Sequence, residues 1–204
     1  LPSVKTGKVK VIAVTGSKRL AAFPDVPTVA ESGLPQFLVD SIAGMLAPAK
    51  TPRDIVNKLS AEAAQCLGAA DYLGNLQSLK LYKNKIGDEG VKYLCESERL
   101  PSLNSLRLAW NEIGPEGARH IAESINLKSL TTLSLAENKI GDEGLKHLAA
   151  STQLSELEYL DIRKNGITDQ GALEFAKSKE FSSLQSIDSS DNPLTEIGKN
   201  AFSE

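Results

Sequence analysis

The sequence predicts an α/β solenoid of five 27-residue repeats, each a short strand, a turn and a helix, preceded by a small α/β segment. An apolar pattern typical of a buried strand returns every 27 residues from residue 76 to residue 204. In the second half of each period the apolar spacing changes to that of a helix. Strands connected by helices run parallel with right-handed crossovers, so we expect a right-handed solenoid with a parallel sheet.

The strand half of the repeat is defined by five positions. The first copy places them at Leu76, Leu79, Leu81, Asn84 and Ile86. Four further copies keep the same register without insertion, and they begin at Leu103, Leu130, Leu157 and Leu184. Alternating leucines are typical of a short strand with one buried face, so each copy predicts one strand.

The helix half follows each strand. Val91, Leu94 and Cys95 have the i, i+3, i+4 spacing of an apolar helical face, and the later copies repeat it. Cys95 occupies a position that alanine holds in the next copies, so we expect a small core residue and not a reactive thiol. Carboxylates at the helix starts suit the helix dipole. They are Asp88, Glu89, Glu116, Asp142, Glu143 and Asp169.

The turn between strand and helix carries a recognisable motif. The segments Asn84–Gly90 and Asn138–Gly144 both read Asn-Lys-Ile-Gly-Asp-Glu-Gly. They resemble the ribonuclease-inhibitor-like class of leucine-rich repeats. That resemblance implies that the leucines fill the core and that the asparagine amides satisfy backbone groups in the turns. The expected structural ladder consists of Asn84, Asn111, Asn138, Asn165 and Asn192.

Residues 1–67 differ from the repeats. We expect strands at Lys8–Thr15 and Ser41–Ala49, and a helix at Pro52–Leu67 that begins with a threonine cap and a proline. The run Pro24-Asp25-Val26-Pro27-Thr28, with Ala47-Pro48 and Thr51-Pro52 downstream, resembles the Bug family of periplasmic tricarboxylate-binding receptors, which implies a bacterial origin for this part.

The resemblance to the receptors covers about a third of the chain and only the late part of such a receptor. The segments that complete the two lobes of its ligand cleft are absent, and Ile42 and Lys50 stand where the family has Trp and Gly. We therefore assign no ligand residue from the family and do not expect a small carboxylate as the ligand.

The chain is predicted to consist of a receptor-like fragment at residues 1–67 and a repeat domain at residues 68–204. The helix at Pro52–Leu67 is in phase with the repeats, because Asn57 and Glu62 lie 27 residues before Asn84 and Glu89. We expect this helix to cover the first repeat as an N-terminal cap. A natural fusion, an engineered chimera and an assembly artefact are three open origins of the join.

Several function classes are excluded by composition and motif. The net charge of −3 does not favour nucleic acid as a partner. No apolar run approaches the roughly 18 residues of a membrane span, and Val11–Val14 is too short for a signal-peptide core, so we expect a soluble chain of open localisation. No catalytic or phosphate-binding motif, and no Cys/His cluster, predicts an enzyme, a cofactor or a metal site. His120 and His147 are interpreted as surface residues.

The concave face of the predicted sheet is the candidate binding surface. Residues between the buried leucines align in columns, and the middle column changes from basic Lys80 and Arg107 to acidic Asp161 and Asp188. Trp110 is the only tryptophan and lies near Arg107. The expected contact residues are Lys80, Tyr82, Lys83, Arg107, Trp110, Glu137, Tyr159, Asp161, Arg163 and Asp188.

The sequence therefore predicts a non-catalytic module that binds a protein partner on this face, because Trp, Tyr and Arg are the residue types enriched in interfaces. Two alternatives remain: a remnant of a carboxylate receptor, and a purely structural or chimeric scaffold.

Overall fold

The structure, a computed structural model, describes residues 24–25, 41–42, 53–68 and 73–202. The chain divides into two compact units, Leu1–Ser41 and Ile42–Glu204. The strand expected at Lys8–Thr15 lies outside the described residues. At Ser41–Ala49 the described strand is β1 (Ser41–Ile42), and the remainder of that expected strand also lies outside them.

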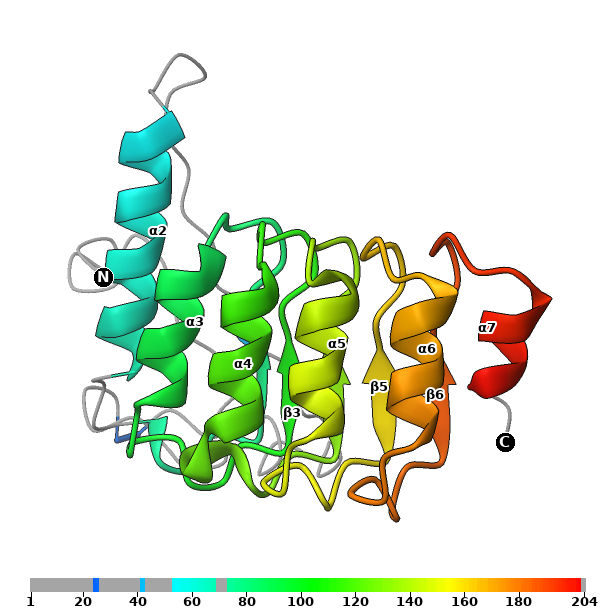
Figure 1. Cartoon of the computed structure of the whole chain (residues 1–204). Helices are drawn as coiled ribbons and strands as arrows, with labels where there is room; N and C mark the ends of the chain where they lie inside the picture. Colours follow the sequence, from blue (N-terminus) through cyan, green and yellow to red (C-terminus); the bar gives the residue numbers. More distant parts are fainter. Residues whose placement is uncertain (1–23, 26–40, 43–52, 69–72, 203–204) are drawn as a thin grey trace. The chain divides into compact units, whose positions relative to one another are not determined.

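The second unit consists of strand–helix repeats in one parallel sheet (Figure 1). The sheet order is β1-β2-β3-β4-β5-β6. The repeat strands are β2 (Ser78–Lys80), β3 (Ser105–Arg107), β4 (Thr132–Ser134), β5 (Tyr159–Asp161) and β6 (Ser186–Asp188). The helices are α3 (Gly87–Cys95), α4 (Pro115–Glu123), α5 (Gly141–Ala149), α6 (Asp169–Ala176) and α7 (Glu196–Ala201), with a 3₁₀ helix, η2 (Ile125–Leu127), after α4.

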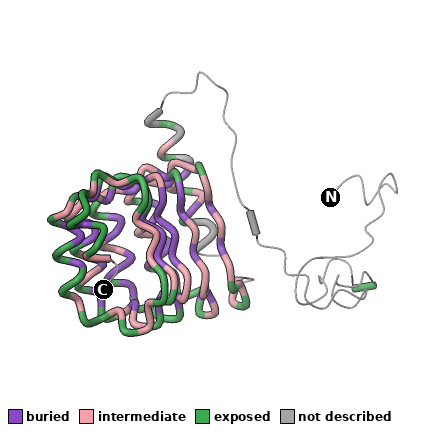
Figure 2. Tube along the Cα trace, turned by 90° about the vertical axis from the view of Figure 1, so that its right-hand side faces the viewer, coloured by how far each residue is buried: buried purple, intermediate pink, exposed green. Residues whose placement is uncertain are grey.

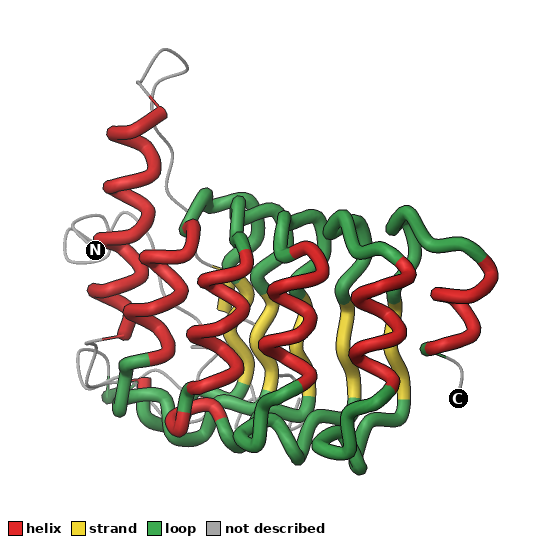
Figure 3. The backbone as a smooth tube through the Cα atoms, in the orientation of Figure 1, coloured by secondary structure: helices red, strands yellow, loops and turns green. Residues whose placement is uncertain are grey.

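The strand register follows the repeat period. Leu79 pairs with Leu106, and each later pair of strands keeps the same offset of one repeat. The helices lie side by side in one layer and the strands in a second layer, joined by long turns (Figure 3). These features confirm the predicted solenoid with a parallel sheet.

The core lies between the two layers (Figure 2). Leu79 and Leu81 are buried while Lys80 between them is half-buried, as the alternation predicts. Val91 and Leu94 meet them from α3 and are also buried. Fully burying a leucine stabilises a fold by about 1.5–3 kcal/mol, so the repeated leucines provide the main driving force for stacking.

Helix α2 (Arg53–Gly68) continues the row of repeat helices, at the position where a helix was expected for Pro52–Leu67. It packs against α3, and Ala64 joins the core with 2% of its surface exposed. A Cβ added to Gly90 would lie 3.4 Å from the Cα of Ala61. One repeat later, a Cβ added to Gly117 would lie 3.4 Å from the Cα of Asp88. Helix α2 therefore contacts α3 in the same way that α3 contacts α4.

Cys95 lies at the C-terminal end of α3 and is buried. Burial raises the pKa of its thiol to about 12. The thiolate is the reactive form, so Cys95 is a core residue, as predicted. Within the described ranges, no helix combines the length and apolar character needed to cross a membrane.

Candidate functional site

The asparagine side chains hold the turns at the edge of the concave face. The Oδ1 atom of Asn111 accepts hydrogen bonds from the backbone N–H groups of Asn84 (2.9 Å) and Ile86 (3.4 Å). Its Nδ2 donates to the carbonyl of Leu81 at 2.6 Å. Equivalent bonds join each later asparagine to the preceding repeat, through Asn138, Asn165 and Asn192. These side-chain amides are hydrogen-bonded to backbone groups of the repeats and are not directed at a ligand.

A column of left-handed residues precedes the asparagines. Its members are Lys83 (φ 57°), Trp110 (φ 57°), Glu137 (φ 57°), Lys164 (φ 51°) and Asp191 (φ 58°). In this conformation the first four residues donate their N–H groups to the next repeat, as Trp110 does to the carbonyl of Ala136. A non-glycine residue in this region costs about 1–2 kcal/mol. The fold thus holds five residues with a strained backbone at the strand ends.

Trp110 is the one aromatic residue of this column. It shows 45% of its surface, although a large apolar side chain gains most from burial. The Nζ atom of Lys83 lies 4.6 Å from the centroid of the indole ring. That distance permits a cation–π contact. One face of the indole therefore meets a cation, and much of the ring remains open to a partner.

The acidic half of the middle column is internally paired. Asp161 is only 4% exposed, and its carboxylate accepts hydrogen bonds from Ser134 Oγ (2.9 Å) and Arg163 Nε (2.9 Å). Arg163 Nε also lies 3.3 Å from a carboxylate oxygen of Asp188. These carboxylates raise the pKa of Arg163, chiefly through the bond to Asp161. The expectation that Asp161 is an exposed contact residue is corrected: burial and two bonds make it a support for Arg163.

The basic half of the column has a different environment. Lys80 and Arg107 are adjacent in the register of β2 and β3, and both are half-buried. The Nε of Arg107 is buried and has no hydrogen-bond partner among the described residues. Tyr82 is half-buried beside them.

The remaining predicted residues flank these two halves. Glu137 forms an ion pair (2.7 Å) with Lys164 of the adjacent repeat. Tyr159 is half-buried, and burial raises the pKa of its phenol. Ala109 and Ala136, in the column of Tyr82, are buried, so that column presents large side chains only at Tyr82 and Arg163.

Two further ladders were not identified from the sequence. Asp88 Oδ1 accepts the N–H groups of Gly114 (2.7 Å) and Gly117 (3.0 Å), so it caps the next helix and not its own, which has no side-chain cap. Asp142 and Asp169 cap the following helices in the same way two and three repeats later. A serine ladder closes the other end of the helices: Ser124, Ser151 and Ser178 each donate to a carbonyl 29 residues earlier. Their 27-residue recurrence was the signal available in the sequence.

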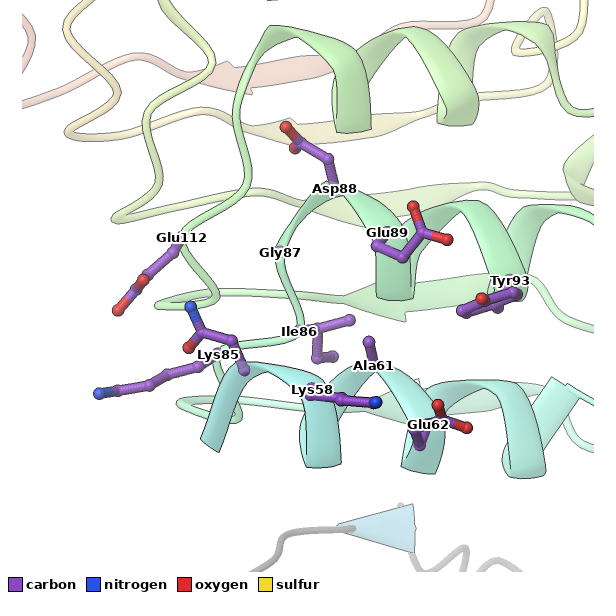
Figure 4. Close-up of a pocket in the computed structure, with 11 residues that line it drawn as sticks. Lys58, Ala61, Glu62, Lys85, Ile86, Gly87, Asp88, Glu89, Tyr93 and Glu112 are labelled. Carbon is purple, nitrogen blue, oxygen red and sulfur yellow. The ribbon is translucent and has the colours of Figure 1, made fainter. Parts of the chain in front are cut away.

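A groove of about 460 Å³ lies between α2 and the start of α3 (Figure 4). Its lining mixes cations from Lys58 and Lys85 with carboxylates from Glu62 and Glu89, beside the ring of Tyr93. The described ranges contain no group of three or more His, Cys, Asp or Glu residues that could hold a metal ion. The full lining has two lysines against four carboxylates, because Asp88 and Glu112 also belong to it, but it contains no such cluster, so this groove is a weaker candidate than the concave face.

Two families match two different parts of the chain. Residues 1–85 match the tripartite tricarboxylate transporter family receptor. Residues 99–122, 126–149 and 154–176 match the leucine-rich repeat. The chain thus joins a receptor-like segment to leucine-rich repeats, as the sequence predicted. The receptor match extends beyond residue 67 into the first repeat.

Two relatives match the receptor-like part of the chain. A UPF0065 protein from the tcbD–tcbE intergenic region of Pseudomonas sp. strain P51 is 40% identical over 73 residues, 35% of this chain and 22% of that protein. A UPF0065 protein of Bordetella bronchiseptica is 36% identical over 59 residues, 29% of this chain and 17% of that protein. The chain therefore spans about a fifth of the length of these relatives.

The repeat fold has a solved counterpart. The C-terminal domain of tropomodulin from Caenorhabditis elegans aligns with a TM-score of 0.56 and 19% identity, over 70% of this chain and 89% of that one. At this identity the likeness shows a shared fold alone.

Proposed function

We propose that this chain is a non-catalytic module that binds a protein partner on the concave face of its repeats. Leucine-rich repeats present a continuous surface formed by adjacent strands, which suits an extended contact. Tyr82, Arg107 and Trp110 supply the residue types that dominate binding energy in interfaces.

Trp110 is the observation that supports the proposal most strongly. It combines 45% exposure with a left-handed backbone, and both features cost the folded chain free energy. Glycine would relieve the backbone strain at this position. A tryptophan that costs stability in the free chain is best explained by burial of its ring in a complex.

The test is the substitution Trp110→Gly. We expect thermal stability to change little, because relief of the backbone strain of about 1–2 kcal/mol offsets the lost burial of the partly covered ring. Partner capture from a lysate of the expressing cells should fall at least about tenfold, the usual effect of losing an anchor residue. Quantitative mass spectrometry of the captured proteins measures this change.

Leu173→Ala is the matched control, since Leu173 is 44% exposed but belongs to helix α6. It should leave the captured partner unchanged. If Trp110→Gly instead lowers stability by several kcal/mol, Trp110 is a packing residue. If capture is equal in all three proteins, the face is scaffold and a structural role replaces the proposal.

Solute capture is the alternative suggested by the receptor match. The chain spans only about a fifth of the length of its receptor-like relatives, so their ligand is the less supported candidate for this chain. Calorimetric titration of the chain with citrate should give no binding heat, whereas saturable heat would favour the receptor function.

A further inference from the structure

The last repeat has a neighbour on one side only among the described residues. Strand β6 pairs with β5 and with no other described strand, and α7 is the last helix of the same array (Figure 1). At the opposite end of the repeats, α2 packs against α3. The side of β6 that faces away from β5, from Gln185 to Ser189, is called the open edge below.

The open edge has backbone groups that are paired in every inner repeat. Ile162 donates its N–H to the carbonyl of Asp188, and the carbonyl of Glu158 accepts the N–H of Gln185. One repeat later, the matching groups are the N–H of Ser189 and the carbonyl of Gln185. Neither has a hydrogen-bond partner among the described residues. An unpaired strand edge of this kind is a template for a further strand.

These two groups lie symmetrically about Ile187, two residues to either side of it. Backbone groups alternate in direction along a strand, so the N–H and the carbonyl of Ile187 also face the open edge. In an antiparallel pair, opposite residues exchange both of their N–H···O bonds. A second copy related by a two-fold rotation therefore places Ile187 opposite Ile187. It also places the Ser189 N–H of each copy opposite the Gln185 carbonyl of the other.

The side chains of β6 suit the same arrangement. Asp188 of each copy would lie opposite Ser186 of the other, so a carboxylate meets a hydroxyl and like charges do not face each other. Ile187 is only partly buried, whereas Leu160, its neighbour in β5, is fully buried, and a second Ile187 would cover it. Other apolar residues of the last repeat are also only partly buried: Leu184, Leu194 and Phe202.

We propose that the chain forms a two-fold dimer in which β6 pairs antiparallel with β6 of a second copy. A foreign strand could also bind an open edge, but the hydrogen-bond order and the charges of this edge are complementary to themselves. Such a self-complementary patch defines a closed dimer. The inference goes beyond the proposed function and does not depend on it. Trp110 stays open to a partner, because β4 and β5 separate its repeat from β6.

The first test measures the oligomeric state of the full chain by sedimentation equilibrium. We expect a dimer that dissociates on dilution. Ser189→Pro removes an N–H that the dimer uses twice and the single chain does not use, and proline blocks edge strands. The Kd of the dimer should rise at least about tenfold, as expected from the loss of two hydrogen bonds. Ser189→Ala is the matched control and should retain the dimer.

The second test changes the charge opposite Asp188. Ser186 is exposed, so Ser186→Asp and Ser186→Lys should both unfold near the temperature of the native chain. Ser186→Asp should weaken the dimer and Ser186→Lys should strengthen it, because each places its charge opposite Asp188 of the other copy. Both effects should shrink at 1 M salt, where the Debye length is about 3 Å. Ser105→Asp, at the same position of the inner strand β3, should leave the dimer unchanged.

A native chain that stays monomeric at millimolar concentration would overturn the proposal and leave the open edge to another occupant, such as a strand of a partner. A dimer that both Ser186 variants shift in the same direction would show that the copies meet on another face. This comparison also decides the matter if Ser189→Pro does not fold. Trp110→Gly should leave the dimer unchanged, so the loss of partner capture and the loss of dimerisation can be told apart.

Discussion

At the scale of single residues, the asparagine amides connect the backbone of each repeat to the next repeat. Asn111 is fully buried and satisfies two N–H groups and one carbonyl of the preceding repeat. A buried backbone group without a partner costs about 1–3 kcal/mol. One side chain thus prevents three such losses, so an apolar substitute at this position should destabilise the repeats.

Asn111→Ala should therefore lower the free energy of unfolding by about 3 kcal/mol, measured by urea denaturation. Asn192→Ala is the matched control. Asn192 makes the same kind of bonds but is only half-buried, so water can replace part of its amide. Equal losses at the two positions would show that burial does not set the cost.

At the scale of the element, the helices begin in two ways. Helices α4, α6 and α7 begin after an extended residue, and an aspartate from the previous repeat caps each one. Helices α3 and α5 begin at glycines with φ of 63° and 59° and have no side-chain cap. At the position one repeat before α3, where an aspartate would be needed for a cap, the chain has Ala61. At the same position before α5 it has Pro115. The residue one period earlier therefore determines how each helix starts.

Asp88→Ala should destabilise the array by about 1 kcal/mol, the usual cost of losing a helix cap. The amide of Gly117 should exchange faster in hydrogen-exchange measurements, because it loses its acceptor. Glu89→Ala is the control, since Glu89 is exposed and lies beside Asp88 in the same first turn. An unchanged exchange rate at Gly117 in Asp88→Ala would contradict the cap.

At the scale of the whole molecule, α2 takes the place of a repeat helix at one end of the array. It lies within the segment that matches the receptor family, yet Ala64 contributes to the core of the repeats. The end of a solenoid exposes apolar surface unless something covers it. We propose that this helix is the N-terminal cap of the array.

Deletion of residues 1–50 should leave the thermal unfolding of the repeats nearly unchanged, because α2 is retained. Deletion of residues 1–72 should lower the unfolding temperature by about 5 °C or more. Each exposed core side chain costs about 1.5–3 kcal/mol, and 1 kcal/mol corresponds to about 2–4 °C at this size. If both deletions have the same effect, α2 is not the cap.

The repeat period predicted the strands, the helices and the asparagine positions because each depends on local spacing. The burial of Asp161 could not be predicted in this way. It depends on Ser134 from the previous repeat and on the direction in which Arg163 bends, and neither is encoded in the spacing. The groove beside α2 was missed for a similar reason, since its residues come from helices of unlike origin.

The two kinds of helix start also limit how this array can grow by recombination. In a tandem duplication the second copy of a repeat follows the first copy directly. The helix of the second copy must therefore start in the way that the capping residue of the first copy permits. The repeat containing Thr168 and Asp169 meets this condition, because it begins with an extended residue and carries the aspartate that such a start requires. The repeat containing Pro115 begins the same way but carries no aspartate, so its tandem copy would begin uncapped. Gene duplications that lengthen the protein should therefore start from the former unit.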